Sequence, residues 1–128
     1  MSDVLATGSA WLEGKRHAHM TQSVVYQRGA DSTPLLATIG RTVFEQADEF
    51  GVVHRIEARD FLIRAADLVL AGETALPIAG DQITKAVGNT VLVYEVMPFG
   101  GEPPFRYSNP DRTTLRIHTK HVATQGPA

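Results

Sequence analysis

From residue 23 onward, short runs rich in apolar and β-branched residues recur along this chain, and in some of them apolar and polar positions alternate, which predicts a mainly β protein. In the last such run, residues 113–122, the positions on one face are Leu115, Ile117 and Thr119, and charged or polar residues separate them. Successive side chains of a strand point to opposite faces of a sheet. We therefore expect this run to be a strand with one buried face.

Turn-forming residues separate the runs and indicate that neighbours in sequence pair as hairpins. The first predicted hairpin joins 23–28 to 35–39, and another joins 82–87 to 90–97 across Gly88-Asn89. We expect both hairpins to be antiparallel because their connections are short.

A separate short strand is predicted at 42–45, followed after a turn by a long strand at 52–63. The face that carries the apolar residues changes within the long run, since Ile56 and Ala58 occupy even-numbered positions and Phe61 an odd-numbered one. Such a change is typical of a β-bulge, which we expect near Asp60.

Three segments differ from this strand pattern. Residues 1–22 are predicted to form an N-terminal helical or extended arm, with a short helix at 3–19, and residues 123–128 a flexible tail. A long Pro/Gly-rich loop is expected at 98–112. The fold prediction is therefore a small antiparallel β-barrel domain over 23–122 with these appendages.

Composition narrows the class of protein. The 128 residues suit one domain, carry a formal net charge of −2 and include no cysteine, which excludes disulfides and thiolate metal sites. No apolar stretch approaches the ~20 residues that span a bilayer, and no signal peptide is evident at the start, so we expect no membrane contact and synthesis in the cytoplasm. No basic stripe typical of a nucleic-acid-binding protein is present.

Carboxylates and histidines are the candidates for chemistry. The carboxylates in or beside strands are Asp60, Asp67, Asp81 and Glu95. Structural roles in turns and on wet strand faces fit them better than an acid–base pair, because no positioned partner is evident. The histidine clusters are His17 with His19 and His118 with His121. No further ligand is signalled, so we expect these to be surface residues and predict no metal, cofactor or catalytic residue.

Aromatic and apolar residues outside the strands indicate a surface for assembly. They lie on the N-terminal segment and on the long loop. Aromatic anchors dominate the energetics of protein interfaces. The candidate interface residues are Trp11, Leu12, Phe99, Phe105 and Tyr107.

The order of several short motifs resembles a known family over roughly residues 20–122. These motifs are Arg59-Asp60-Phe61-Leu62-Ile63, Asp67-Leu68, Pro77 followed by Gly80-Asp81-Gln82-Ile83, Tyr94-Glu95-Val96-Met97-Pro98 and Arg116-Ile117-His118-Thr119-Lys120. In this order they resemble small neck proteins of tailed phages and prophages, in the head–tail joining or head-closure (stopper) group.

The resemblance implies a structural, non-enzymatic virion protein made in the bacterial host. Its subunits would form a homo-oligomeric ring, six- or twelve-fold, beneath the portal and adaptor. That ring would contact tail proteins and surround double-stranded DNA without sequence-specific binding. The resemblance implies no catalytic residues.

Three alternatives stay open at this stage. The departure of the N-terminal segment from the compact stoppers leaves a tail-terminator or tail-completion role. Converging histidines would instead indicate a small metal-dependent or hydrolytic β-barrel enzyme. Exposed strand aromatics with basic neighbours would indicate an oligonucleotide-binding barrel.

Overall fold

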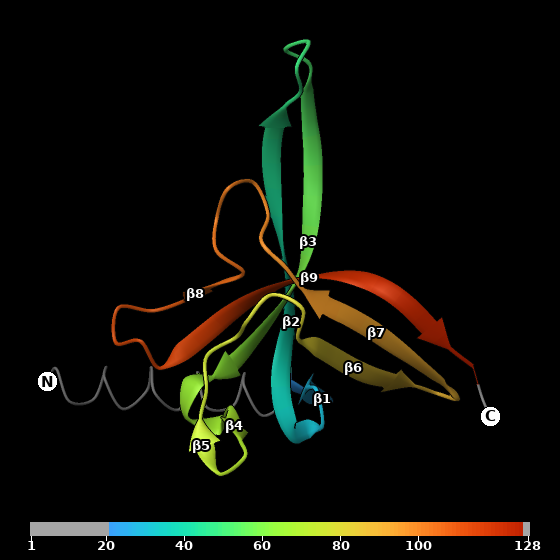
Figure 1. The fold of residues 1–128 in the computed structure, drawn as a ribbon, viewed down its shortest axis with the longest axis vertical. Coiled ribbons are helices and arrows are strands. Elements are labelled where there is room, and N and C mark those ends of the chain that lie inside the picture. Colours follow the sequence, from blue (N-terminus) through green and yellow to red (C-terminus); the bar gives the residue numbers. More distant parts are fainter. Residues whose placement is uncertain (1–20, 127–128) are drawn as a thin grey trace, which may run out of the picture.

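A computed structural model of the chain describes residues 21–126, and most of them lie in antiparallel strands (Figure 1). In chain order the elements are β1 (Thr21–Arg28), β2 (Asp31–Ala47), β3 (Val53–Arg64), the 3-10 helix η1 (Ala65–Asp67), β4 (Val69–Leu70), β5 (Glu73–Thr74), β6 (Gln82–Val87), β7 (Thr90–Val96), β8 (Phe105–Tyr107) and β9 (Thr114–Gln125). The mainly β prediction is confirmed, whereas the expected helix at 3–19 lies outside the described residues.

Six of these strands close into a ring of antiparallel pairs. The sheet runs β3-β2-β1-β6-β7-β9-β8, and a further pairing of β3 with β9 joins its two sides. Both predicted hairpins are present, as β1 with β2 and as β6 with β7. The short strands β4 and β5 form a separate pair. Closure of the ring fixes β3 and β9 side by side.

The core fills the inside of this ring. Its fully buried large apolar side chains are Tyr26, Phe61, Ile63, Leu68, Ile83, Val96, Leu115 and Ile117. The rings of Phe61 and Tyr94 meet edge to face with centroids 5.1 Å apart. Each such side chain contributes about 1.5–3 kcal/mol on burial, so the alternation of apolar residues in the sequence accounts for the ring.

Strands β2 and β3 are longer than the ring requires. The sequence predicted a separate strand at 42–45, but this segment continues β2, which runs unbroken for 17 residues. The distal halves of β2 and β3 project from the ring as a two-stranded hairpin (Figure 1). We call residues 41–57 the arm.

The predicted bulge near Asp60 is wrong. The ladders of β3 with β2 and with β9 both pass Asp60 in unbroken register. The apolar residues switch from one face of β3 to the other because the two faces pack on different clusters. Ala58 faces a small cluster at the base of the arm, and Phe61 faces the core inside the six-stranded ring. The register shift lies elsewhere, between β7 and β9 at Val93 and Tyr94.

The long loop between β7 and β9 is partly ordered by pairing. Phe99 and Glu102 form an isolated bridge, and β8 adds to β9. At its end the Asn109 side-chain oxygen accepts hydrogen bonds from the amides of Thr113 at 3.1 Å and Thr114 at 3.0 Å. Strand β9 continues to Gln125. Within residues 21–126, no helix has the length and apolar character needed to cross a membrane.

Candidate functional site

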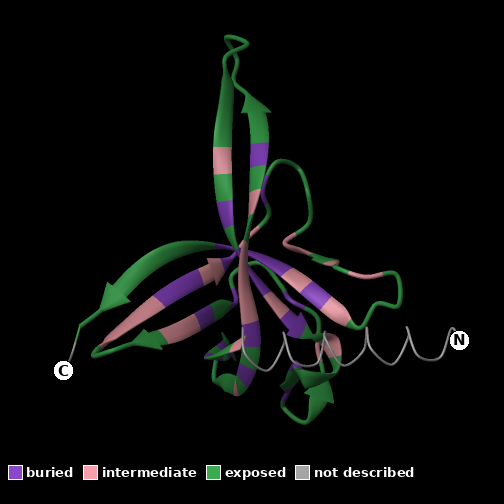
Figure 2. Cartoon of the chain, turned by 180° about the vertical axis from the view of Figure 1, so that it is seen from behind, coloured by how far each residue is buried: buried purple, intermediate pink, exposed green. Residues whose placement is uncertain are grey.

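The tip of the arm exposes a group of apolar side chains. Phe50 is 82% exposed, and Val52 and Val53 are also exposed. Figure 2 shows the distal arm almost entirely exposed, in contrast to its base. Isolated exposed apolar residues are common, but a group on a projecting element is typical of a contact with another molecule.

A small hydrogen-bond network shapes the turn at this tip. One oxygen of Asp48 accepts the amides of Phe50 and Val52, each at 2.9 Å, and its other oxygen contacts the His54 ring at 2.9 Å. The hydrogen bond with His54, followed by that from the Val52 amide, lowers the pKa of Asp48. Gly51 supplies a positive φ of 79°. The turn is therefore fixed in shape although its side chains are exposed.

The base of the arm is clamped by the loop after β7. The ring of Phe99 stacks on Phe44 at a centroid distance of 5.7 Å, and Ala58 completes this buried cluster. Gly100 allows the close approach, because its φ is +55° and a Cβ there would lie 2.9 Å from Phe44. The lower part of the arm is thus packed against this loop on one face, whereas the side chains at its tip are exposed to solvent.

Beside this clamp lies a buried polar centre on Asp60, where β2, β3 and β9 meet. Asp60 accepts hydrogen bonds from Nδ1 of His118 at 2.8 Å, from Nη1 of Arg116 at 2.6 Å and from the Thr42 hydroxyl. Asp60 and His118 are fully buried.

The partners of Asp60 keep it ionised. Burial alone raises the pKa of this carboxyl, but the hydrogen bonds from His118, Thr42 and Arg116 outweigh it and bring the pKa below its usual range. Because an ionised carboxylate only accepts, His118 donates through Nδ1. Its Nε2 is buried without a hydrogen bond in the described chain and lies 3.7 Å from Glu102. The centre ties the arm, the ring and the loop together.

A second buried carboxylate, Asp81, fixes the turn before β6. It accepts the Tyr26 hydroxyl, Nη2 of Arg28 at 2.8 Å and the amide of Ile78 at 3.0 Å. Burial raises the pKa of Asp81, but the hydrogen bonds from Arg28, Tyr26 and Ile78 lower it further than burial raises it. Burial, with the hydrogen bond to Asp81, raises the pKa of Tyr26. Arg28 also donates to the carbonyl of Leu76 at 2.6 Å, which closes the turn.

These two carboxylates predict a loss of stability in acid. Their pKa values are lower in the folded chain than the unfolded value of about 3.9, so the unfolded chain binds more protons as the pH falls. We expect the free energy of unfolding to be constant from neutral pH to about pH 5 and to decrease steadily below about pH 4. Urea unfolding at a series of pH values from neutral to about pH 3 measures this dependence of stability on pH. An unchanged midpoint at about pH 3 would contradict it.

The structure places the predicted interface residues in different environments. Phe99 is buried against Phe44, and Phe105 and Tyr107 are half-buried against the ring core. Arg112 lies over the Tyr107 ring at 5.5 Å. Trp11 and Leu12 lie outside the described residues. Whether any of the five contacts another protein stays a prediction.

Among the predicted candidates, the structure brings one carboxylate and one histidine into contact, Asp60 and His118. Asp60 and Asp81 occupy separate centres, and His118, expected on the surface, is buried beside Asp60. His121 is exposed and contacts the Thr124 hydroxyl instead. Over residues 21–126, no three His, Cys, Asp or Glu side chains gather as they would around a metal ion. His17 and His19 lie outside the described residues.

Sequence reasoning missed the arm as a candidate surface. A usable signal was present: Phe50, Val52 and Val53 are apolar but surround a turn that begins at Asp48, where solvent-exposed residues are usually polar. Polar partners of Asp60 were not predictable from spacing, because Arg116 and His118 lie more than fifty residues away along the chain.

Comparison with known protein families identifies the chain's relatives. The family model for the phage head-tail joining protein matches residues 2–126. The chain belongs to this family. A comparison with curated protein sequences gives no match.

Membership confirms the family that the sequence resembles. Head-tail joining proteins are structural phage proteins, so this chain is a component of the virion with partners in the head and the tail. In that setting the two buried carboxylate centres are elements that stabilise a scaffold.

Proposed function

We propose that this member of the head-tail joining family is a head-closure subunit that assembles into a ring at the phage neck, between the portal or adaptor and the tail. The projecting arm carries this proposal. Its base is fixed by Phe99 and by the Asp60 centre, whereas Phe50 and Val52 at the tip have no cover within residues 21–126. A rigid support with a bare apolar end is what a subunit needs to bind neighbours.

A ring at this position would surround the double-stranded genome. The net charge of −2 supports passage of DNA without tight binding, because affinity for DNA comes mainly from neutralised phosphates. The proposed role requires no reaction, in keeping with a structural family.

Phage that lacks this gene and is complemented with a Phe50→Ser, Val52→Ser variant tests the proposal. We expect heads and tails to accumulate unjoined, with the infectious titre at least about tenfold below wild type, because loss of an interface anchor costs about 2 kcal/mol or more. Electron microscopy of the lysate and plaque counts measure both effects.

Val87→Ser is the matched control, because Val87 is 47% exposed at the end of β6, away from the arm. It should join heads to tails normally. Joined particles at wild-type yield with the arm variant would contradict the proposal. Tails of uneven length, with heads and necks intact, would instead favour a tail-completion role.

A further inference from the structure

A groove lies where the arm separates from β9. Strand β9 pairs with β3 only as far as Arg59 and Thr119, and the two strands then diverge (Figure 1). Beyond this fork, 53–58 of β3 pairs only with β2, and 120–125 of β9 pairs only with β7, among the described residues. Both strands therefore present free backbone edges toward the fork, which are sites at which another chain can add.

The groove in this fork combines cationic and apolar side chains. It has a volume of about 270 Å³ and is lined by the cations Arg59 and Lys120, by His121, and by Leu92 and Tyr94. The first three are exposed, and His121 lies against the Tyr94 ring at 5.4 Å. Glu57 also lines the groove, but its carboxylate is directed to Arg41 at 3.9 Å.

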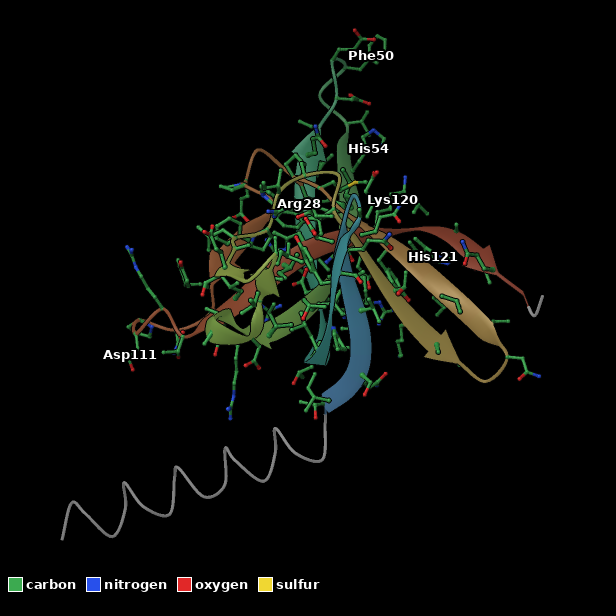
Figure 3. The ribbon with its side chains drawn as sticks, turned by 60° about the horizontal axis from the view of Figure 1, so that its bottom comes forward. Arg28, Phe50, His54, Asp111, Lys120 and His121 are labelled. Carbon is green, nitrogen blue, oxygen red and sulfur yellow. The ribbon has the colours of Figure 1, made fainter. Side chains whose placement is uncertain are left out.

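The tip of the arm has the complementary character. Residues 42–54 contain Glu45, Asp48 and Glu49 and no lysine or arginine, and Arg55 lies opposite Glu45 on the paired strand, so the acidic character is concentrated at Asp48 and Glu49. Phe50 extends from the end of the tip, far from Lys120 and His121 (Figure 3). An acidic turn that carries an exposed aromatic side chain matches a groove that offers cations beside an apolar floor.

The tip cannot reach the groove of its own chain. The groove lies at the root of the same hairpin, and the strand between Phe50 and Arg59 is extended, so the two are about 25 Å apart at the usual rise per residue. We propose that the arm tip of one copy docks in the β3–β9 groove of a second copy, with Phe50 on Leu92 and Tyr94. This inference rests on the proposed assembly of subunits into a ring at the phage neck.

Such a contact has a definite symmetry. Each copy offers one tip and one groove, which are different surfaces, so the contact is heterologous and repeats from copy to copy until the ring closes. The acidic Glu49 side chain would pair with Lys120 of the next copy, and the free strand edges of the fork would supply backbone hydrogen bonds to the arm.

Photo-cross-linking in assembled particles tests the contact. The Phe50 side chain is replaced by a benzophenone amino acid in the complementing gene, purified particles are irradiated, and cross-linked peptides are identified by mass spectrometry. We expect links from position 50 to peptides of the same protein that contain 92–94 or 119–121. Links to any other segment, or to a different protein, would overturn the docking proposal.

Charge reversal gives an independent measurement. Glu49→Lys and Lys120→Glu should each reduce the yield of joined particles about tenfold, because like charges oppose each other across the contact. The double variant should recover most of the yield, since each tip then meets an altered groove. Arg106→Glu, on the exposed face of β8, is the charge control and should join normally. A double variant no better than the weaker single variant would refute the pairing.

The outcomes separate this inference from the proposed function. Cross-links between copies through other segments would refute the proposed docking contact but would still support a ring of subunits. Absence of the protein from purified joined particles would refute the proposed head-closure function itself.

Discussion

Replacing Asp60 with asparagine is expected to lower the free energy of unfolding by about 3–5 kcal/mol, the usual cost of removing one partner from a buried ionic network. His118 and Arg116 donate to different oxygens of Asp60, so the NH₂ group of asparagine would replace one acceptor and face the donor of one of them, and the negative charge would be lost. His118 is fully buried, so its donor cannot find water instead. Urea unfolding of the two purified proteins at neutral pH measures the difference.

Asp111→Asn is the matched control for this change. Asp111 is exposed in the loop before β9, and no hydrogen bond to its side chain is found within residues 21–126. A change within about 0.5 kcal/mol is expected for such a surface position. If Asp60→Asn cost no more than the control, the Asp60 centre would not stabilise the folded chain.

Replacing Asp81 with asparagine is expected to cost about 2–3 kcal/mol, less than the change at Asp60. The Tyr26 hydroxyl is buried and loses a charged acceptor, whereas Arg28 is 31% exposed and regains water when its partner is removed. The turn that Asp81 holds through the Ile78 amide should also loosen. Urea unfolding gives the energy, and hydrogen exchange of the amides near the turn reports its opening.

Tyr26→Phe provides the comparison at this centre. It removes one hydrogen bond and leaves Asp81 with Arg28 and the Ile78 amide. We expect it to cost about 1 kcal/mol. An Asp81→Asn protein as stable as Tyr26→Phe would show that the ion pair with Arg28 contributes nothing measurable.

Local pattern was enough to predict the hairpins and the strand class. Alternation placed Leu115, Ile117 and Thr119 on one face of β9, and all three are buried. Gly88-Asn89 marked the β6–β7 turn because few other residues adopt the backbone it needs. These features depend on neighbours in sequence, so a single chain carries the information.

Features that depend on distant segments were not predictable in this way. Alternation cannot distinguish a strand that ends at the ring from one that continues beyond it, so β2 was divided into two strands. His118 lies on the polar face predicted for β9, and it is buried because Asp60 on β3, Phe44 on the arm and Phe99 in the loop pack around it. The apolar residues around the Asp48 turn gave a local signal for the candidate site, but the projection of that turn on two long strands depends on the folded chain.

The continuity of β2 and β3 between the ring and the arm has a mechanical consequence. Each strand belongs to both parts, and no loop interrupts either one where they meet. A pull on the tip would pass along the covalent backbone into the wall of the ring, and the Arg59–Arg64 ladder with β9 would resist it as a row of hydrogen bonds. In the proposed ring of subunits, each one would therefore tilt as a single stiff unit when its neighbour moves.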